Sequence, residues 1–273
     1  MNTTSPASSP PRRRWIAFSI RGVLAFILVL ALWLGWLVHQ ARQRREAVAA
    51  VKQFGGWVHY DYEFAPGPVV VPEGNNLWMT SWGKLTPGRT PWASPWLRRS
   101  LGDEYFTKIA HVSLFVDIQK GQASAAPYGK TAEDVLAKLA TQSSVRTLQI
   151  GGRHATDQGM ESVGQMTGLE ELIIFPAREI TDDGVAHLGK LRNLRIILLS
   201  QAKLTDAGLR TLGSLPNLEE IMVDGQGFSD EGLTALRGLA HLKVLSLGGG
   251  QDHVTEVGRR KLQALLPNLT TLK

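Results

Sequence analysis

The residues best suited to chemistry lie in one polar and aromatic run, His59-Tyr60-Asp61-Tyr62-Glu63. On a strand, His59, Asp61 and Glu63 would share one face, and imidazole and carboxylate groups together can hold a hard metal ion. Successive side chains on that face lie about 7 Å apart, which is too far for all three to share one ion. We therefore expect no metal site here.

Other patterns are equally weak as catalytic sites. Gly248-Gly249-Gly250 lacks the following Lys-Ser/Thr of a phosphate-binding loop. Asp182-Asp183 falls at an expected helix start, and no His stands beside a Ser or Cys in a nucleophile motif. The chain has no cysteine, which excludes disulfides and thiolate metal sites. We expect no enzyme activity, no cofactor and no metal.

A short phrase recurs five times in the C-terminal half, at intervals of 25, 24, 24 and 26 residues. Its copies are Thr156-Asp157-x-Gly159, Thr181-Asp182-x-Gly184, Thr205-Asp206-x-Gly208, Ser229-Asp230-x-Gly232 and Thr255-Glu256-x-Gly258. Thr or Ser is a good helix N-cap, and an acidic residue after it favours the positive end of the helix dipole. The recurring Gly suggests close packing between stacked helices.

A second element, apolar at its first, fourth and sixth positions, alternates with that phrase. Its copies are Val145-x-x-Leu148-x-Ile150, Leu169-x-x-Leu172-x-Ile174, Leu194-x-x-Ile197-x-Leu199, Leu218-x-x-Ile221-x-Val223 and Leu242-x-x-Leu245-x-Leu247. A degenerate copy begins at Ile109, and a truncated copy at Leu269. One short strand and one helix in about 24 residues is the leucine-rich-repeat pattern, an α/β solenoid.

Residues between the buried strand positions should point onto the concave face, in one row per position. The rows place apolar side chains beside one another, with acidic residues around them. We predict a partner-binding surface formed by Glu171, Ile173, Phe175, Ile196, Leu198, Glu220, Met222, Asp224 and Val244. The alternative is that a Trp-rich segment of the same chain covers these residues.

The N-terminal region contains 17 residues without a charge, Gly22 to Val38, or about 25 Å of helix. We predict a disordered basic tail at 1–14 and a single transmembrane helix at 15–39 that lies in the lipid bilayer. A cleaved signal peptide would need a shorter apolar region and a small-x-small cleavage site. Four basic residues flank each side, so the positive-inside rule gives no orientation.

Net charge excludes one class of partner. Residues 1–52 carry eight Lys or Arg and one acidic residue, whereas residues 145–273 carry fourteen and fifteen. The basic character therefore belongs to the flanks of the apolar helix, and we expect no nucleic-acid partner.

Two segments connect the apolar helix to the repeats. Residues 40–54 are expected to form a juxtamembrane helix, a stalk with Ala47, Val51 and Phe54 on one face. Residues 55–105, rich in Trp and Pro, are expected to form an irregular cap over the first edge of a repeat domain at 106–273, because terminal repeats need shielding.

The chain resembles bacterial membrane-anchored leucine-rich-repeat proteins. The resemblance is carried by Phe54-Gly55-Gly56-Trp57-Val58, by Pro95-Trp96-Leu97-Arg98-Arg99-x-Leu101-Gly102-Asp103-Glu104-Tyr105-Phe106 and by the Thr-Asp-x-Gly-Leu repeats. It implies a repeat-built interaction domain on a tether. Similar repeats usually carry Asp in the strand where this chain has Ile173, Leu198 and Met222.

Two hypotheses for function follow. In the first, a membrane-tethered scaffold binds a protein or peptide on its concave face. In the second, the solenoids self-associate as a homo-oligomer through an uncapped C-terminal edge. A short N-terminal tail before one helix is typical of a signal anchor, which favours an extracytoplasmic repeat domain.

Overall fold

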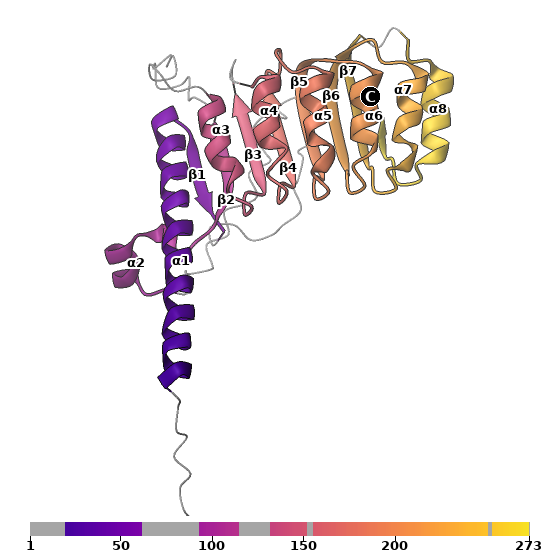
Figure 1. The fold of residues 1–273 in the computed structure, drawn as a ribbon. Coiled ribbons are helices and arrows are strands. Elements are labelled where there is room, and N and C mark those ends of the chain that lie inside the picture. Colours follow the sequence, from indigo (N-terminus) through magenta and orange to yellow (C-terminus); the bar gives the residue numbers. More distant parts are fainter. Residues whose placement is uncertain (1–19, 62–92, 115–131, 152–154, 251–252, 273) are drawn as a thin grey trace, which may run out of the picture. The chain divides into compact units, whose positions relative to one another are not determined.

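The computed structural model describes residues 20–61, 93–114, 132–151, 155–250 and 253–272 (Figure 1). The chain divides into two compact units, residues 1–40 and 41–273. The expected tail at 1–14, residues 15–19, the metal-candidate residue Glu63 and most of the Trp-rich segment lie outside the described residues.

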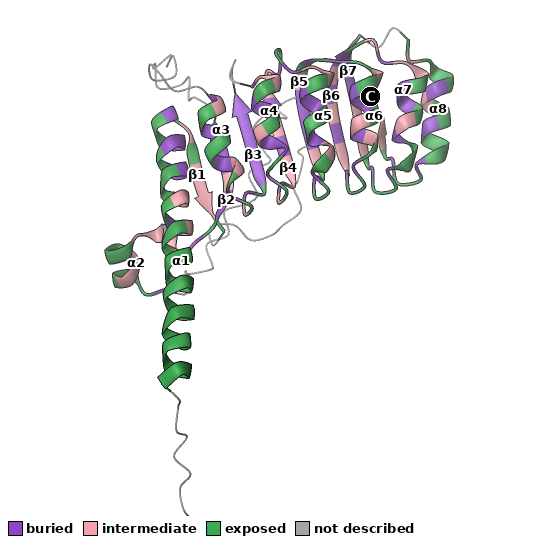
Figure 2. Cartoon of the chain, viewed as in Figure 1, coloured by how far each residue is buried: buried purple, intermediate pink, exposed green. Residues whose placement is uncertain are grey.

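The first unit contains the N-terminal part of helix α1, Ile20–Phe54. Its apolar window has a mean hydropathy of 2.2, and none of that window is buried within the protein (Figure 2). By length and composition α1 can cross a membrane; a signal sequence near an N-terminus meets the same criteria.

The C-terminal part of α1 belongs to the second unit and is not a stalk. Ala47, Val51 and Phe54, the predicted stripe, are buried in the same hydrophobic core as the repeats, together with Val48 and Ala50. The expectation of a stalk is wrong because this stripe is buried in the core of the repeat domain.

Eight strands form one sheet in sequence order. They are β1 Trp57–Tyr60, β2 Ile109–Leu114, β3 Thr147–Gly151, β4 Glu171–Phe175, β5 Ile196–Leu204, β6 Glu220–Gln226, β7 Val244–Gly250 and β8 Thr271–Leu272. All neighbours pair in parallel except β1, which pairs antiparallel with β2. Strand β1 thus satisfies the backbone groups at the first edge of the solenoid.

A helix follows each strand from β2 to β7 and packs on one face of the sheet (Figure 1). These helices are α3 Ala132–Ala140, α4 Asp157–Val163, α5 Asp182–Ala186, α6 Asp206–Gly213, α7 Asp230–Ala235 and α8 Glu256–Leu265. Short 3₁₀ turns extend α5 (His187–Lys190) and α7 (Leu236–Gly238). Before β2 lie α2, Pro95–Leu101, and a 3₁₀ turn, Asp103–Tyr105.

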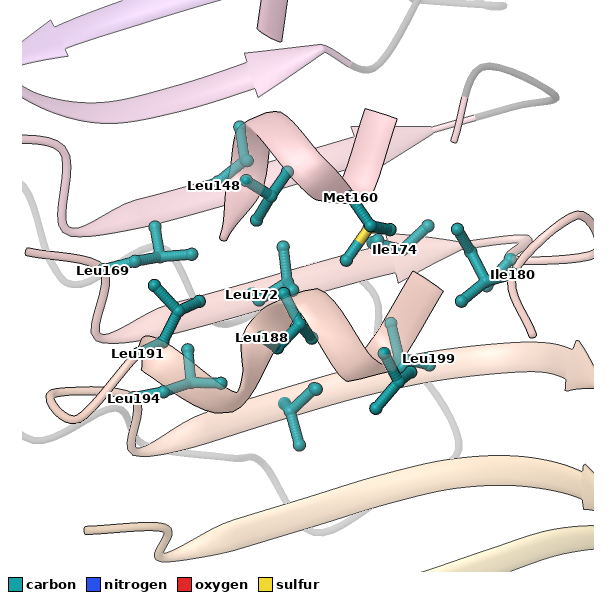
Figure 3. Close-up of a cluster of buried hydrophobic side chains, with 14 of the residues drawn as sticks. Leu148, Met160, Leu169, Leu172, Ile174, Ile180, Leu188, Leu191, Leu194 and Leu199 are labelled. Atoms are coloured by element: carbon teal, nitrogen blue, oxygen red, sulfur yellow. The ribbon is translucent and has the colours of Figure 1, made fainter. Parts of the chain in front are cut away.

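The core lies between the sheet and these helices (Figure 3). Leu148, Leu172 and Leu199 point from their strands toward Met160 and Leu188 of the helical layer, and all five are fully buried. Each repeat buries its apolar positions against its neighbours, as the pattern predicted. The structure is a leucine-rich-repeat solenoid.

Candidate partner-binding face

The strand register aligns the predicted rows. In the first row Glu171 pairs with Ile196, Ile196 with Glu220, and Glu220 with Val244. In the second row Ile173 pairs with Leu198, and Leu198 with Met222. Side chains at the same register of adjacent parallel strands lie about 4.8 Å apart, so each row is a continuous line across the sheet face opposite α3–α8, called the concave face below.

Along β4 and β6, partly exposed residues on the concave face alternate with buried residues on the opposite face. Glu171, Ile173 and Phe175 are partly exposed, whereas Leu172 and Ile174 between them are buried. Ile196, Met222 and Val244 are also partly exposed, while their strand neighbours Ile197, Val223 and Leu245 are buried. One face of the sheet is committed to the core, and the other presents apolar side chains.

Leu198 departs from the expected exposure. Its side chain is only 7% exposed. Its register partners on both sides, Ile173 and Met222, are large, and Ile196 precedes it on the same face of β5. We infer that Leu198 forms the floor of the apolar row, while the partly exposed side chains around it form the surface.

The first strands of the solenoid differ from β4–β7. Every residue of β3 is buried, including Thr147 and Gln149, which belong to the concave rows. Ser113 of β2 is buried in the same way. The exposed part of the concave face therefore begins at β4.

Two carboxylates lie within the apolar rows rather than around them. Glu171 accepts a hydrogen bond from the Thr147 hydroxyl at 3.2 Å. Burial raises the pKa of Glu171 to about 7, and the nearby Glu170 and Glu220 add to that effect. Burial and the adjacent Glu219 also raise the pKa of Glu220. The Oε2 atom of Glu220 is buried and accepts no hydrogen bond within the described part of the chain.

Asp224, the third predicted acidic residue, has a different environment. Its carboxylate accepts hydrogen bonds from the Ser200 hydroxyl at 3.1 Å and from the Gln201 backbone N–H at 2.5 Å. Gln201 adopts φ of 63°, the left-handed conformation. Asp224 thus stabilises β5 where the register of its pairing with β6 shifts, and its Oδ2 atom is already used within the protein.

A charge ladder lies directly beside the first row, and the sequence analysis missed it. Residues immediately before the strands alternate in sign: Arg146, Glu170, Arg195, Glu219 and Lys243. Arg146 pairs with Glu170 at 2.5 Å, and Glu219 pairs with both Arg195 and Lys243 at 2.6 Å. The signal was present as alternating charges at 24- to 25-residue intervals.

The repeated Thr/Ser-Asp-x-Gly phrase forms a second ladder, on the turns before the helices. Asp206 accepts from both the backbone N–H and the hydroxyl of Ser229, at 2.9 and 2.5 Å. Asp157, Asp182 and Asp230 bind the Thr of the next repeat in the same way. The Asp therefore links consecutive repeats, a role beyond the predicted helix-dipole interaction.

The Asp ladder explains why the phrase contains Gly. A Cβ at Gly232 would collide with the carboxylate of Asp206, and a Cβ at Gly208 would lie 2.6 Å from Asp182 Oδ1. The close approach is thus to a carboxylate of the preceding repeat. Gly159 is the exception, since its nearest neighbour is the Leu136 side chain at 3.1 Å.

The residues first considered for chemistry make contacts that stabilise the fold. The Asp61 carboxylate accepts a hydrogen bond from the Lys108 backbone N–H, and the Asp61 backbone N–H donates to the Lys108 carbonyl oxygen. Gly248 leaves room for the Asp224 carboxylate in the neighbouring strand. Within the described ranges, no group of three or more His, Cys, Asp or Glu side chains could hold a metal ion.

Comparison with known proteins gives similarity to solved structures alone. No family model matches the chain, and no curated protein matches it. An internalin (InlF) from Listeria monocytogenes is 20% identical over 50% of this chain and 43% of its own, with a TM-score of 0.36. The plant peptide hormone receptor RGFR1, in complex with RGF2, is 17% identical over 50% of this chain and 21% of its own, with a TM-score of 0.33. The chain thus spans less than half the length of either protein.

Proposed function

We propose that this protein is a membrane-tethered leucine-rich-repeat scaffold that binds a protein or peptide partner on the concave face of β4–β7. The observation that carries the proposal is the partly exposed apolar surface made by Ile173, Ile196, Met222 and Val244 above the buried Leu198. Exposed apolar patches set among polar residues are typical of protein interfaces.

The two carboxylates within this surface define the chemistry of the partner. Glu171 and Glu220 flank Ile196 in the first row, and both have a raised pKa because they are partly desolvated. A Lys or Arg side chain of a partner would donate a hydrogen bond to Glu220 Oε2, and its positive charge would stabilise the carboxylates of Glu171 and Glu220. We therefore propose an apolar segment that carries at least one basic residue.

Selection from a displayed random-peptide library tests this function, with the full-length chain in lipid nanodiscs as bait. We expect enrichment of peptides that combine apolar and basic residues. Met222→Lys places a charge in the second row and should abolish the enrichment. Leu265→Lys, on α8, is the control because Leu265 is also an apolar surface residue, with 54% of it exposed, but lies outside the concave face. Equal enrichment on both variants would refute binding at the concave face.

Glu220→Gln separates binding of an apolar segment from recognition of its basic residue. It keeps the size of the side chain and removes the charge, so the apolar preference should persist while the basic preference is lost. If wild-type protein enriches apolar peptides without a basic residue, the face binds a partner but the assigned partner chemistry is wrong.

Self-association through the surface of α8 and β8 is a second candidate function. Helix α8 exposes Val257 and Leu265, and β8 is a two-residue strand that pairs only with β7 among the described strands. Light scattering of the full chain in detergent should then show a concentration-dependent dimer that Leu265→Lys disrupts. A monomer at all concentrations excludes this function.

We propose that α1 anchors the protein as a single-pass helix, with the repeat domain outside the cytoplasm. The chain has no cysteine, so Ser214→Cys, in an exposed turn, provides a single labelling site. A membrane-impermeant thiol reagent should label it in intact cells. Labelling only after lysis would reverse the orientation, and release of the protein by alkaline carbonate would refute the anchor.

A further inference from the structure

Helix α2, Pro95–Leu101, has an unusual surface that the proposed function does not use. None of its residues is buried. Trp96 is 67% exposed and Leu101 is 48% exposed, among the most exposed large apolar side chains in the second unit. Trp96, Arg99 and Ser100 lie three and four residues apart, on one face of the helix, and all three are exposed.

Hydrogen bonds hold α2 next to the start of the second unit. Arg45 Nη2 donates to the carbonyl oxygen of Leu101 at 3.1 Å, and Arg44 Nη1 donates to that of Thr107 at 3.2 Å. Arg98 pairs with Asp103 at 2.5 Å, which leaves Arg99 as the basic residue of the exposed face. Residues Leu101–Thr107, which include the end of α2, are thus held against Arg44 and Arg45 of α1 within the second unit.

The chain places this surface close to the end of the apolar stretch. Arg45 follows Val38, the last residue of that stretch, by seven residues, which reach at most about 25 Å even when extended. Tryptophan prefers the boundary between headgroups and acyl chains, and arginine is attracted to anionic headgroups. Both side chains are presented by one short helix.

We propose that α2 is an interfacial helix that lies on the bilayer surface, with Trp96 at the headgroup boundary and Arg99 on anionic headgroups. This inference depends on the proposed membrane anchor. The lipid contact gives the repeat domain a second attachment point, which restricts its orientation relative to the membrane.

The absence of native cysteine allows a direct test in the full-length chain. A nitroxide spin label at Ser100→Cys, one helical turn from Trp96, is compared with one at Ser214→Cys in nanodiscs of phosphatidylcholine and phosphatidylglycerol. We expect the ratio of oxygen collisions to nickel-chelate collisions to be several-fold higher at position 100. Trp96→Ala should lower that ratio, and uncharged nanodiscs should lower it less.

Trp57→Ala is the matched control. Trp57 is also about half exposed, but it belongs to β1, where it pairs with Ser113 of β2, and not to α2. It should leave the label at position 100 unchanged. Equal collision ratios at positions 100 and 214 would overturn the proposal. So would protection of position 100 from both reagents with a short spin–spin distance, which would instead assign α2 to contact with a second copy.

Alkaline carbonate extraction of the same proteins separates this result from the anchor. A protein retained in the membrane with a water-exposed label refutes the interfacial helix and leaves the anchor intact. A protein released from the membrane refutes both.

Discussion

Two regions of each repeat, the turn before the helix and the strand on the concave face, differ in how far their residues vary from one repeat to the next. In the turns, each repeat carries nearly the same residues, and each Asp binds the Thr or Ser of the next repeat. On the concave face the residues change from strand to strand, from Thr147 to Glu171 to Ile196. The comparison indicates that the repeated residues hold the stack together and that the concave-face residues can vary without breaking these links, as the proposed binding face requires.

The largest effect should come from breaking the turn ladder in its middle. Asp206→Ala leaves the Ser229 backbone N–H and hydroxyl without their acceptor, and we expect a loss of about 3 kcal/mol in the free energy of unfolding. Urea titration of the full chain in mild detergent, followed by circular dichroism, measures it. Glu256→Ala is the control, because Glu256 is exposed and forms a surface ion pair with Arg260 of the same helix; it should cost less than about 0.5 kcal/mol. Similar losses for both would show that the ladder does not link the repeats.

The glycine of the phrase should be nearly as sensitive. Gly232→Ala brings a methyl group against the Asp206 carboxylate and should cost about 2 kcal/mol. At Gly159→Ala the closest contact of the new methyl group is the end of the Leu136 side chain at 3.1 Å, and alanine is a better helix former by about 1 kcal/mol, so stability should change little or rise. The same titration compares the two. A loss at Gly159 as large as at Gly232 would contradict the assigned role of the carboxylate.

On the concave face, pH should reveal the desolvated carboxylate. The pKa of Glu171 is about 7, above its unfolded value of 4.5, so the folded state binds more protons between these values and stability falls as pH rises through this window. Glu171→Gln should remove this dependence and be more stable than wild type by about 1.5 kcal/mol at pH 8, with little difference at pH 4. Urea midpoints at both pH values test it, with the exposed Glu161→Gln as control. A difference that is the same at both pH values would exclude a titrating Glu171.

The smallest effect is expected for the charge ladder. The hydrogen bond from Arg195 holds the pKa of Glu219 below its ordinary value, so this contribution is present at neutral pH and lost on acidification through the folded pKa. Because the ladder lies at the surface, Glu219→Gln should cost less than about 1 kcal/mol at low salt and still less at 0.5 M salt. A cost that is unchanged by salt would mean that packing, and not charge, is lost.

The sequence predicted the parts of the fold that repeat. The strand positions, the helix starts and the alignment of Glu171, Ile196, Glu220 and Val244 follow from a period of about 24 residues combined with side-chain alternation. The link from Asp206 to Ser229 could not be predicted in the same way, because it depends on the stacking distance between repeats.

Other features lay outside the repeat signal. The pairing of β1 with β2 and the burial of Ala47, Val51 and Phe54 depend on long-range packing that no periodicity encodes. The low exposure of Leu198 could not be predicted from side-chain alternation, which places it on the same face as the partly exposed Ile196. Binding by the predicted residues remains a prediction.

The free energy of unfolding of Met222→Lys tests the central claim most directly, because a surface kept for recognition must tolerate a charge in the absence of the partner. Met222 is partly exposed, unlike Leu198, where burial would make a lysine costly in any case. We expect a loss below about 1 kcal/mol, together with loss of peptide enrichment. A loss above about 3 kcal/mol would show that this face is part of the core and would contradict a role in recognition.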